Sequence, residues 1–152
     1  MSDIHPAGSP PVALLDDAGI VELLSSARRI AVVGASSNPG RPSNGVFHSL
    51  LRAGYQCVPV NPRESEVAGI PAVDTLAEAA AALGGTIDIV DVFRRPELTE
   101  EIAREAVAVG ARSLWLQLGV VNWEAARIAA EGGLAVVMDR CTAIEIHRIP
   151  RG

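Results

Sequence analysis

Residues 30–45 read IAVVGASSNPGRPSNG, the pattern of a buried strand that ends in a glycine turn and leads into a helix. The first four residues are apolar without alternation, which is typical of a strand covered on both faces in a parallel sheet. Gly34 and Gly40 let the backbone come close to a ligand where a β-carbon would clash. We expect Ser43 or Asn44 to cap the helix, leaving backbone N–H groups and the positive end of the dipole facing the loop. The stretch therefore predicts a phosphate-binding turn.

The chain is long enough for one domain with a substantial core, having 152 residues of which 49% are hydrophobic. It shows neither an apolar run of about 20 residues nor a secretory signal pattern, so we expect a cytoplasmic protein without a membrane partner. The net charge of −5 and the absence of a basic run argue against nucleic-acid binding. The two cysteines are too few for a disulfide framework. We assign no metal ligands.

All 13 basic residues are arginine, and the sequence contains no lysine. A P-loop nucleotide hydrolase needs a lysine for the β- and γ-phosphates, so that class is excluded. Schiff-base and pyridoxal-phosphate enzymes need a lysine amine and are excluded as well.

Strand and helix patterns alternate along residues 16–152, which we take as a single domain after a flexible N-terminal arm over residues 1–15. The expected strands cover residues 29–33, 56–60, 87–93, 113–118 and 134–138. They predict an α/β, Rossmann-like, doubly wound, mostly parallel five-stranded sheet with helices on both faces. Pro59 would be awkward in a central strand and favours an edge or a bulge for the second strand. The loops after the strands should meet at one edge, where ligands bind in such folds.

The first loop departs from the dinucleotide fingerprint G-x-G-x-x-G, because Ser36 stands where the second glycine should be. No acid follows the second strand at the expected place, which disfavours NAD. Arg63 follows that strand instead and is suited to a ribose-linked phosphate, as in NADP or coenzyme A. Tyr55 is the one tyrosine, and the Tyr-x-x-x-Lys pair of short-chain reductases is absent. An NADP-binding module without that chemistry remains possible.

Six motifs from successive strand ends resemble a known family. They are VVGAS at 32–36, RPS at 41–43, PVNP at 59–62, VDVFR at 90–94, LWLQLGV at 114–120 and MDRC at 138–141. Together they resemble the bacterial CoA-binding domain proteins, single-domain relatives of the N-terminal domain of the succinyl-CoA synthetase α subunit. The resemblance extends over about residues 17–148, and motifs in five loops make it specific.

The resemblance implies a coenzyme A site in these loops. The pyrophosphate would rest on the loop and helix start at 36–44, the 3′-phosphate near Arg63, and the adenine beside Val92 and Phe93. Arg94 is a further candidate for the lining, and the end of the fourth strand matches a segment that lines the family's site. The full set of expected ligand-binding residues is Gly34, Ala35, Ser36, Arg41, Pro42, Ser43, Asn44, Asn61, Pro62, Arg63, Val92, Phe93, Arg94, Leu116, Gln117 and Leu118.

Ligase activity does not follow from the resemblance, because the synthetase's phosphorylated histidine belongs to a second domain that is not part of this sequence. Cys141 is the one weak candidate for chemistry, since a helix start and the neighbouring Arg140 would favour its thiolate. No histidine lies close to it in sequence, and an inert cysteine is the more natural reading. We expect a non-catalytic module that binds coenzyme A or an acyl-CoA. A CoA-linked thiol enzyme using Cys141 and an NADP-binding module are the alternatives.

Overall fold

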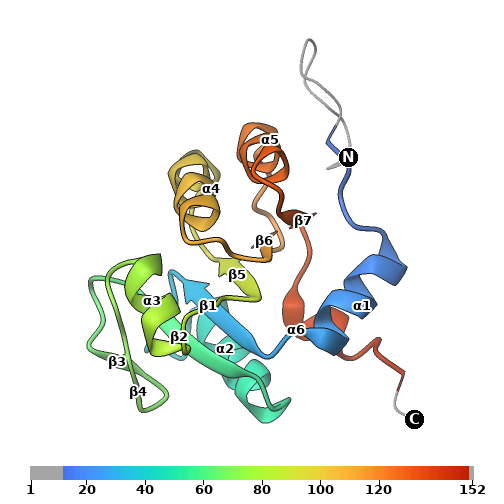
Figure 1. Ribbon diagram of the computed structural model, residues 1–152. Helices are drawn as coiled ribbons and strands as arrows, with labels where there is room; N and C mark the ends of the chain where they lie inside the picture. Colours follow the sequence, from blue (N-terminus) through green and yellow to red (C-terminus); the bar gives the residue numbers. More distant parts are fainter. Residues whose placement is uncertain (1–11, 151–152) are drawn as a thin grey trace.

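The computed structural model describes residues 12–150 (Figure 1). The strands are β1 (Arg29–Val33), β2 (Gln56–Val60), β3 (Glu66–Val67), β4 (Ile70–Pro71), β5 (Ile89–Val92), β6 (Ser113–Leu116) and β7 (Ala135–Met138). The helices are α1 (Asp17–Ser26), α2 (Pro42–Arg52), α3 (Leu76–Ala82), α4 (Thr99–Ala108), α5 (Trp123–Glu131) and α6 (Thr142–Ile146), with a short 3-10 helix, η1 (Pro96–Leu98).

Five strands form one parallel sheet in the order β2-β1-β5-β6-β7. Helices α1, α2 and α6 cover one face, and α3, α4 and α5 cover the other (Figure 1). Taken as the first to fifth strands of this sheet along the chain, the order is 2-1-3-4-5, one of the two common doubly wound arrangements. The predicted fold class is confirmed.

The strands are apolar on both sides because each side faces a helical layer. Ala31, Val33, Val90 and Leu114 belong to the core on the α3–α5 side. Val32 and Trp115 belong to the core under α1, α2 and α6. The register pairs Val32 with Asp91 and Asp91 with Trp115, so a carboxyl group sits in the centre of an otherwise apolar row.

The structure corrects several sequence-based expectations about where helices and strands begin and end. Arg41, in extended backbone, is the N-cap of α2 and Pro42 is its first residue, so the prediction that Ser43 or Asn44 caps this helix is wrong. Proline suits that position because its missing N–H would be unbonded there in any case. The connection between β2 and α3, where the sequence predicts no strand, contains the hairpin of β3 and β4. Three strands are shorter than expected: β5 covers Ile89–Val92 within the expected 87–93, β6 ends at Leu116 instead of residue 118, and β7 begins at Ala135 instead of residue 134.

Both edges of the sheet carry additional backbone contacts. β2 is an edge strand, as Pro59 predicted, and the Pro59 carbonyl accepts a hydrogen bond from the Val73 N–H at 3.0 Å. Residues 1–11 of the predicted N-terminal arm lie outside the described residues. Leu15 is the last residue of the predicted arm, and its N–H donates to the Val136 carbonyl on the opposite edge strand, β7, at 2.9 Å. Between residues 12 and 150, the helices are all too short or too polar to cross a bilayer.

Candidate functional site

The strand order reverses between β1 and β5. The loops that follow these two strands lead to helices on opposite faces of the sheet, α2 and α4. Gly34, directly after β1, has φ +86°, and an ideal β-carbon on it would lie 2.4 Å from the Phe93 carbonyl oxygen. The same β-carbon would lie 3.4 Å from Cδ of Arg94. At the point where doubly wound sheets bind ligands, the two backbone segments therefore approach so closely that position 34 requires glycine.

Side chains from the start of α2 hold the loop after β1 in shape. The Ser36 N–H donates to Oγ of Ser43 at 3.1 Å, and Nδ2 of Asn44 donates to the Ser36 carbonyl at 3.0 Å. Both side chains are buried, which explains why they serve the loop rather than cap the helix. Arg41 makes no side-chain hydrogen bond to the helix start, so its N-terminal turn lacks a side-chain cap. Such a turn favours an anion through its N–H groups and dipole.

Asn61 joins the loops that follow β1 and β2. Its Nδ2 donates to the Ala35 carbonyl at 2.9 Å, and its Oδ1 accepts from the Arg63 N–H at 3.0 Å. The side chain of Asn61 is buried, while Pro62 and Arg63 are exposed. The amide thus fixes the backbone beneath Arg63 and leaves its guanidinium facing solvent.

Three arginines stand apart from the others in the described part of the chain. Within residues 12–150, Arg41, Arg63 and Arg94 are the arginines whose guanidinium groups make neither a hydrogen bond nor an ion pair. They come from the loops after β1, β2 and β5, which are neighbours in the sheet. Three unneutralised positive charges therefore gather at one edge, in a chain whose net charge is −5.

A buried polar cluster lies beside this edge, on the side of α6. Nε2 of Gln117 donates to Oδ1 of Asp91 at 2.7 Å and to Oγ1 of Thr142 at 2.9 Å, and Oγ1 of Thr142 donates to Oδ2 of Asp91 at 3.1 Å. Burial raises the pKa of Asp91 to about 7, although both hydrogen bonds act in the opposite direction. Gln117, expected at the ligand, has its amide N–H groups engaged inside the protein. Asp91 was not among the site residues expected from the sequence. The signal that could have identified it is an acidic residue within an otherwise apolar strand pattern.

The apolar candidates of the site divide into covered and accessible side chains. Val92 and Leu116 are fully buried in the core, so their side chains do not face the loops. Phe93 is half-buried, and Leu118 is 64% exposed. Of the two residues expected beside adenine, Phe93 is the one with an accessible ring.

Cys141 lies at the carboxyl end of β7, as the N-cap of α6. It is half-exposed and borders a hollow of ≈ 340 Å³ at the same edge of the sheet. The neighbouring Arg140 is paired with Asp17 at 2.9 Å and with Glu145 at 3.6 Å, so its charge is already engaged. The side chains that line the hollow are Leu118, Met138, Asp139, Arg140, Cys141, Ile144, Glu145 and Arg148.

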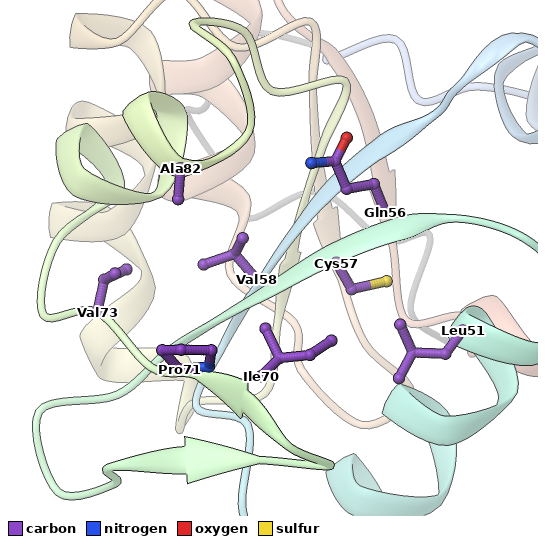
Figure 2. Close-up of a pocket in the computed structure, with 8 residues that line it drawn as sticks. All are labelled: Leu51, Gln56, Cys57, Val58, Ile70, Pro71, Val73 and Ala82. Carbon is purple, nitrogen blue, oxygen red and sulfur yellow. The ribbon is translucent and has the colours of Figure 1, made fainter.

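A second hollow, of ≈ 440 Å³, borders the amino half of β2 (Figure 2). Figure 2 shows Gln56, Cys57 and Val58 along the strand, with Ile70 and Pro71 of β4 on one side and Ala82 of α3 on the other. This hollow is mostly apolar and lies away from the carboxyl ends of the strands. It therefore does not belong to the site of the three arginines. Residues 12–150 contain no cluster of His, Cys, Asp and Glu that would suit a metal ion.

Comparison with known proteins gives consistent results. A family model described as "CoA binding domain" matches residues 28–147. The uncharacterized protein YneT of Bacillus subtilis is 42% identical over 127 residues, covering 84% of this chain and 91% of that protein. A solved structure of a hypothetical protein from Pyrococcus horikoshii has 36% identity and a TM-score of 0.84, covering 95% of this chain and 99% of its own. A Thermus thermophilus protein has 37% identity and a TM-score of 0.79, covering 88% and 98%.

Proposed function

The chain belongs to the CoA-binding domain family, and from that premise we propose that it binds coenzyme A or an acyl-CoA at the carboxyl ends of β1, β2 and β5. The observation that carries the proposal is the gathering of Arg41, Arg63 and Arg94, without ion-pair partners in residues 12–150, at the reversal point of the sheet. Doubly wound sheets bind ligands at this point. Coenzyme A brings a pyrophosphate and a 3′-phosphate, which are the groups that guanidinium pairs best.

Each part of the ligand has a counterpart in the site. The pyrophosphate would lie against the loop at 36–44 and against the start of α2, which no side chain caps, with Arg41 beside it. Arg63, on the backbone fixed by Asn61, would contact the 3′-phosphate. Phe93 would lie next to the adenine, and Arg94, whose side chain passes close to Gly34, would reach the phosphates from the other side.

We propose a role in binding, without turnover. The buried polar side chains of Ser43 and Asn44, at the start of α2, and of Asn61, after β2, are hydrogen-bonded to backbone groups of the loops after β1 and β2. They are therefore engaged in shaping the loops, and a rigid site of this kind suits holding a ligand or presenting it to a partner.

The alternative of a thiol enzyme has one supporting observation, the position of Cys141 beside a hollow at the same edge of the sheet. β7 is three strand spacings from β1, roughly 14 Å at the usual separation, so the thiol end of an extended ligand would have to run across β5 and β6. The NADP alternative rests on Arg63, which suits a 2′-phosphate as well as a 3′-phosphate.

Thermal unfolding with separate additions of coenzyme A, acetyl-CoA, NADPH and ATP tests the proposal. A ligand at a hundredfold excess over its Kd adds about 2.7 kcal/mol and should raise the Tm by roughly 5–10 °C. The triple variant Arg41→Ala, Arg63→Ala, Arg94→Ala should lose the shift. The matched control, with Arg52, Arg104 and Arg112 changed to alanine, removes the same charge outside the loops after β1, β2 and β5 and should keep the shift. A shift with NADPH alone would favour the NADP module, and no shift with any ligand would refute the proposal.

A further inference from the structure

One N–H group of the loop after β1 is bonded to an anionic side chain from elsewhere in the chain. The Ser37 N–H donates to Oε2 of Glu64 at 2.9 Å, across 27 positions of sequence. Glu64 directly follows Arg63 in the loop after β2. The Ser37 N–H first, and the hydroxyls of Ser37 and Ser36 in addition, lower the pKa of this carboxyl group, which is therefore ionised at neutral pH.

The neighbouring N–H groups of the same loop are bonded differently. The Ser36 N–H donates to Ser43, the Asn38 N–H to Oγ of Ser36, and the Gly40 N–H to Oδ1 of Asn38. These acceptors are neutral, and they lie in the loop or in the first turn of α2. The acceptor of Ser37 is instead an exposed, charged oxygen on another loop. A carboxylate oxygen on a backbone N–H is chemically close to a phosphate oxygen in the same position.

We propose that Glu64 is an internal occupant of the phosphate site, with a carboxylate that holds the Ser37 N–H in the free protein and is displaced when the ligand binds. The inference rests on the proposed function, because the Glu64 carboxylate is taken to compete with a phosphate of the proposed ligand for the Ser37 N–H. The negative charge of Glu64 also repels the incoming phosphate for as long as the carboxylate stays at the Ser37 N–H. A substitution that removes this carboxylate should therefore tighten ligand binding.

Displacement of Glu64 has a consequence beyond affinity. The next residue, Ser65, accepts a hydrogen bond from the Ala72 N–H at 3.0 Å, and β3 begins at Glu66. The segment between Asn61 and the β3–β4 hairpin thus loses one of its attachments when the ligand takes the Ser37 N–H. A bound and a free state then differ on the surface beside the site, which is what a sensing module needs.

Titration calorimetry with coenzyme A on the full chain tests the inference. Glu64→Ala should bind about three- to tenfold more tightly than the unsubstituted protein, because a competing charge-assisted hydrogen bond is lost. Glu64→Gln, which keeps an acceptor without the charge, should lie between them. Glu66→Gln is the control, since Glu66 is an exposed acid on the same segment whose carboxylate makes neither a hydrogen bond nor an ion pair within residues 12–150. It should change the Kd less than twofold.

The amide resonance of Ser37 gives a second readout. Its chemical shift should differ between the free protein and free Glu64→Ala, and should become the same once both are saturated with coenzyme A. Unchanged or weaker binding by Glu64→Ala would overturn the inference and leave the proposed function intact, as would Ser37 shifts that still differ at saturation. Absence of binding by all four proteins would overturn the proposed function, and the inference with it.

Discussion

The carbonyl oxygen of Phe93 lies 2.4 Å from the position that a β-carbon on Gly34 would take. The ends of the neighbouring parallel strands β1 and β5 are thus in close backbone contact at the point where the strand order reverses. The Phe93 N–H also donates to the Val33 carbonyl at 2.8 Å, which holds the two ends together. Because Gly34 has no side chain, the loop after β1 can lie this close to Phe93 and Arg94.

Gly34→Ala should lower the free energy of unfolding by more than about 2 kcal/mol, because the left-handed backbone and the clash both oppose a β-carbon. Gly45→Ala is the control. Gly45 lies in α2 with open space around its β-carbon position, and alanine there should stabilise the protein by up to about 1 kcal/mol. Urea unfolding measures both. Equal stability of Gly34→Ala and the unsubstituted chain would show that the two strand ends are not in contact.

Arg63→Ala should weaken coenzyme A binding by about five- to tenfold and leave dephospho-CoA almost unaffected, because the ligands differ in the 3′-phosphate that Arg63 is proposed to contact. Titration calorimetry with both ligands measures the difference. Arg52→Ala, at the other end of α2, should leave both affinities unchanged. An equal loss for the two ligands would contradict the assignment of Arg63.

Asp91→Asn should remove a pH dependence of stability. The pKa of Asp91 is raised from 3.8 to about 7, so the folded protein retains a proton that the unfolded chain releases between these values. Stability contributed by this group is complete below about pH 4, falls as the pH rises, and levels off above about 7, a loss of up to about 4 kcal/mol.

Asparagine retains the acceptor for Gln117 and cannot ionise. Urea unfolding at pH 5 and pH 8 should therefore show a smaller decrease for Asp91→Asn than for the unsubstituted protein. Asp74→Asn, at an exposed position, controls for a change of net charge. If the two carboxamide variants change alike with pH, Asp91 does not titrate in this range.

A thiol reagent should modify one cysteine in each folded chain. Burial, and the nearby charge of Asp91, raise the pKa of Cys57 to about 12, while Cys141 is half-exposed. Cys141→Ala should therefore abolish labelling of the native protein and retain the affinity for coenzyme A. Turnover of an acyl-CoA by the unsubstituted protein that is lost in this variant, with binding retained, would instead favour the thiol-enzyme alternative.

The strands that decide the fold could be predicted from the sequence. The bounds of β1 and β2 match those expected, because unbroken apolar runs ended by glycine or by Asn-Pro have few other readings. The β3–β4 hairpin was missed because strands of two residues are too short to show a period. The start of α2 was misplaced because Ser43 and Asn44 suit a helix cap equally well in sequence, while tertiary contacts direct their side chains to the loop.

The positions of the loops that form the candidate site could be predicted from the sequence, but the hydrogen bonds within them could not. These loops could be located from the strand ends, and Arg41, Arg63 and Arg94 lie there without a partner for the guanidinium group in residues 12–150. That Gln117 points at Asp91 depends on the alignment of β5 with β6, and that Glu64 reaches Ser37 depends on two loops meeting across 27 residues. Such pairings follow from tertiary packing, and a local pattern does not encode them.

The contact between Leu15 and Val136 helps to protect the sheet against edge-to-edge aggregation. An edge strand presents unpaired N–H and C=O groups that can pair with a strand of another chain. On the β2 side, Pro59 removes one donor and the Val73 backbone occupies its carbonyl. On the β7 side the N-terminal segment performs this task, with Leu15 bonded to the strand. A chain shortened to begin at residue 16 would keep the loops after β1, β2 and β5 and expose that edge of the sheet, and it should aggregate more readily.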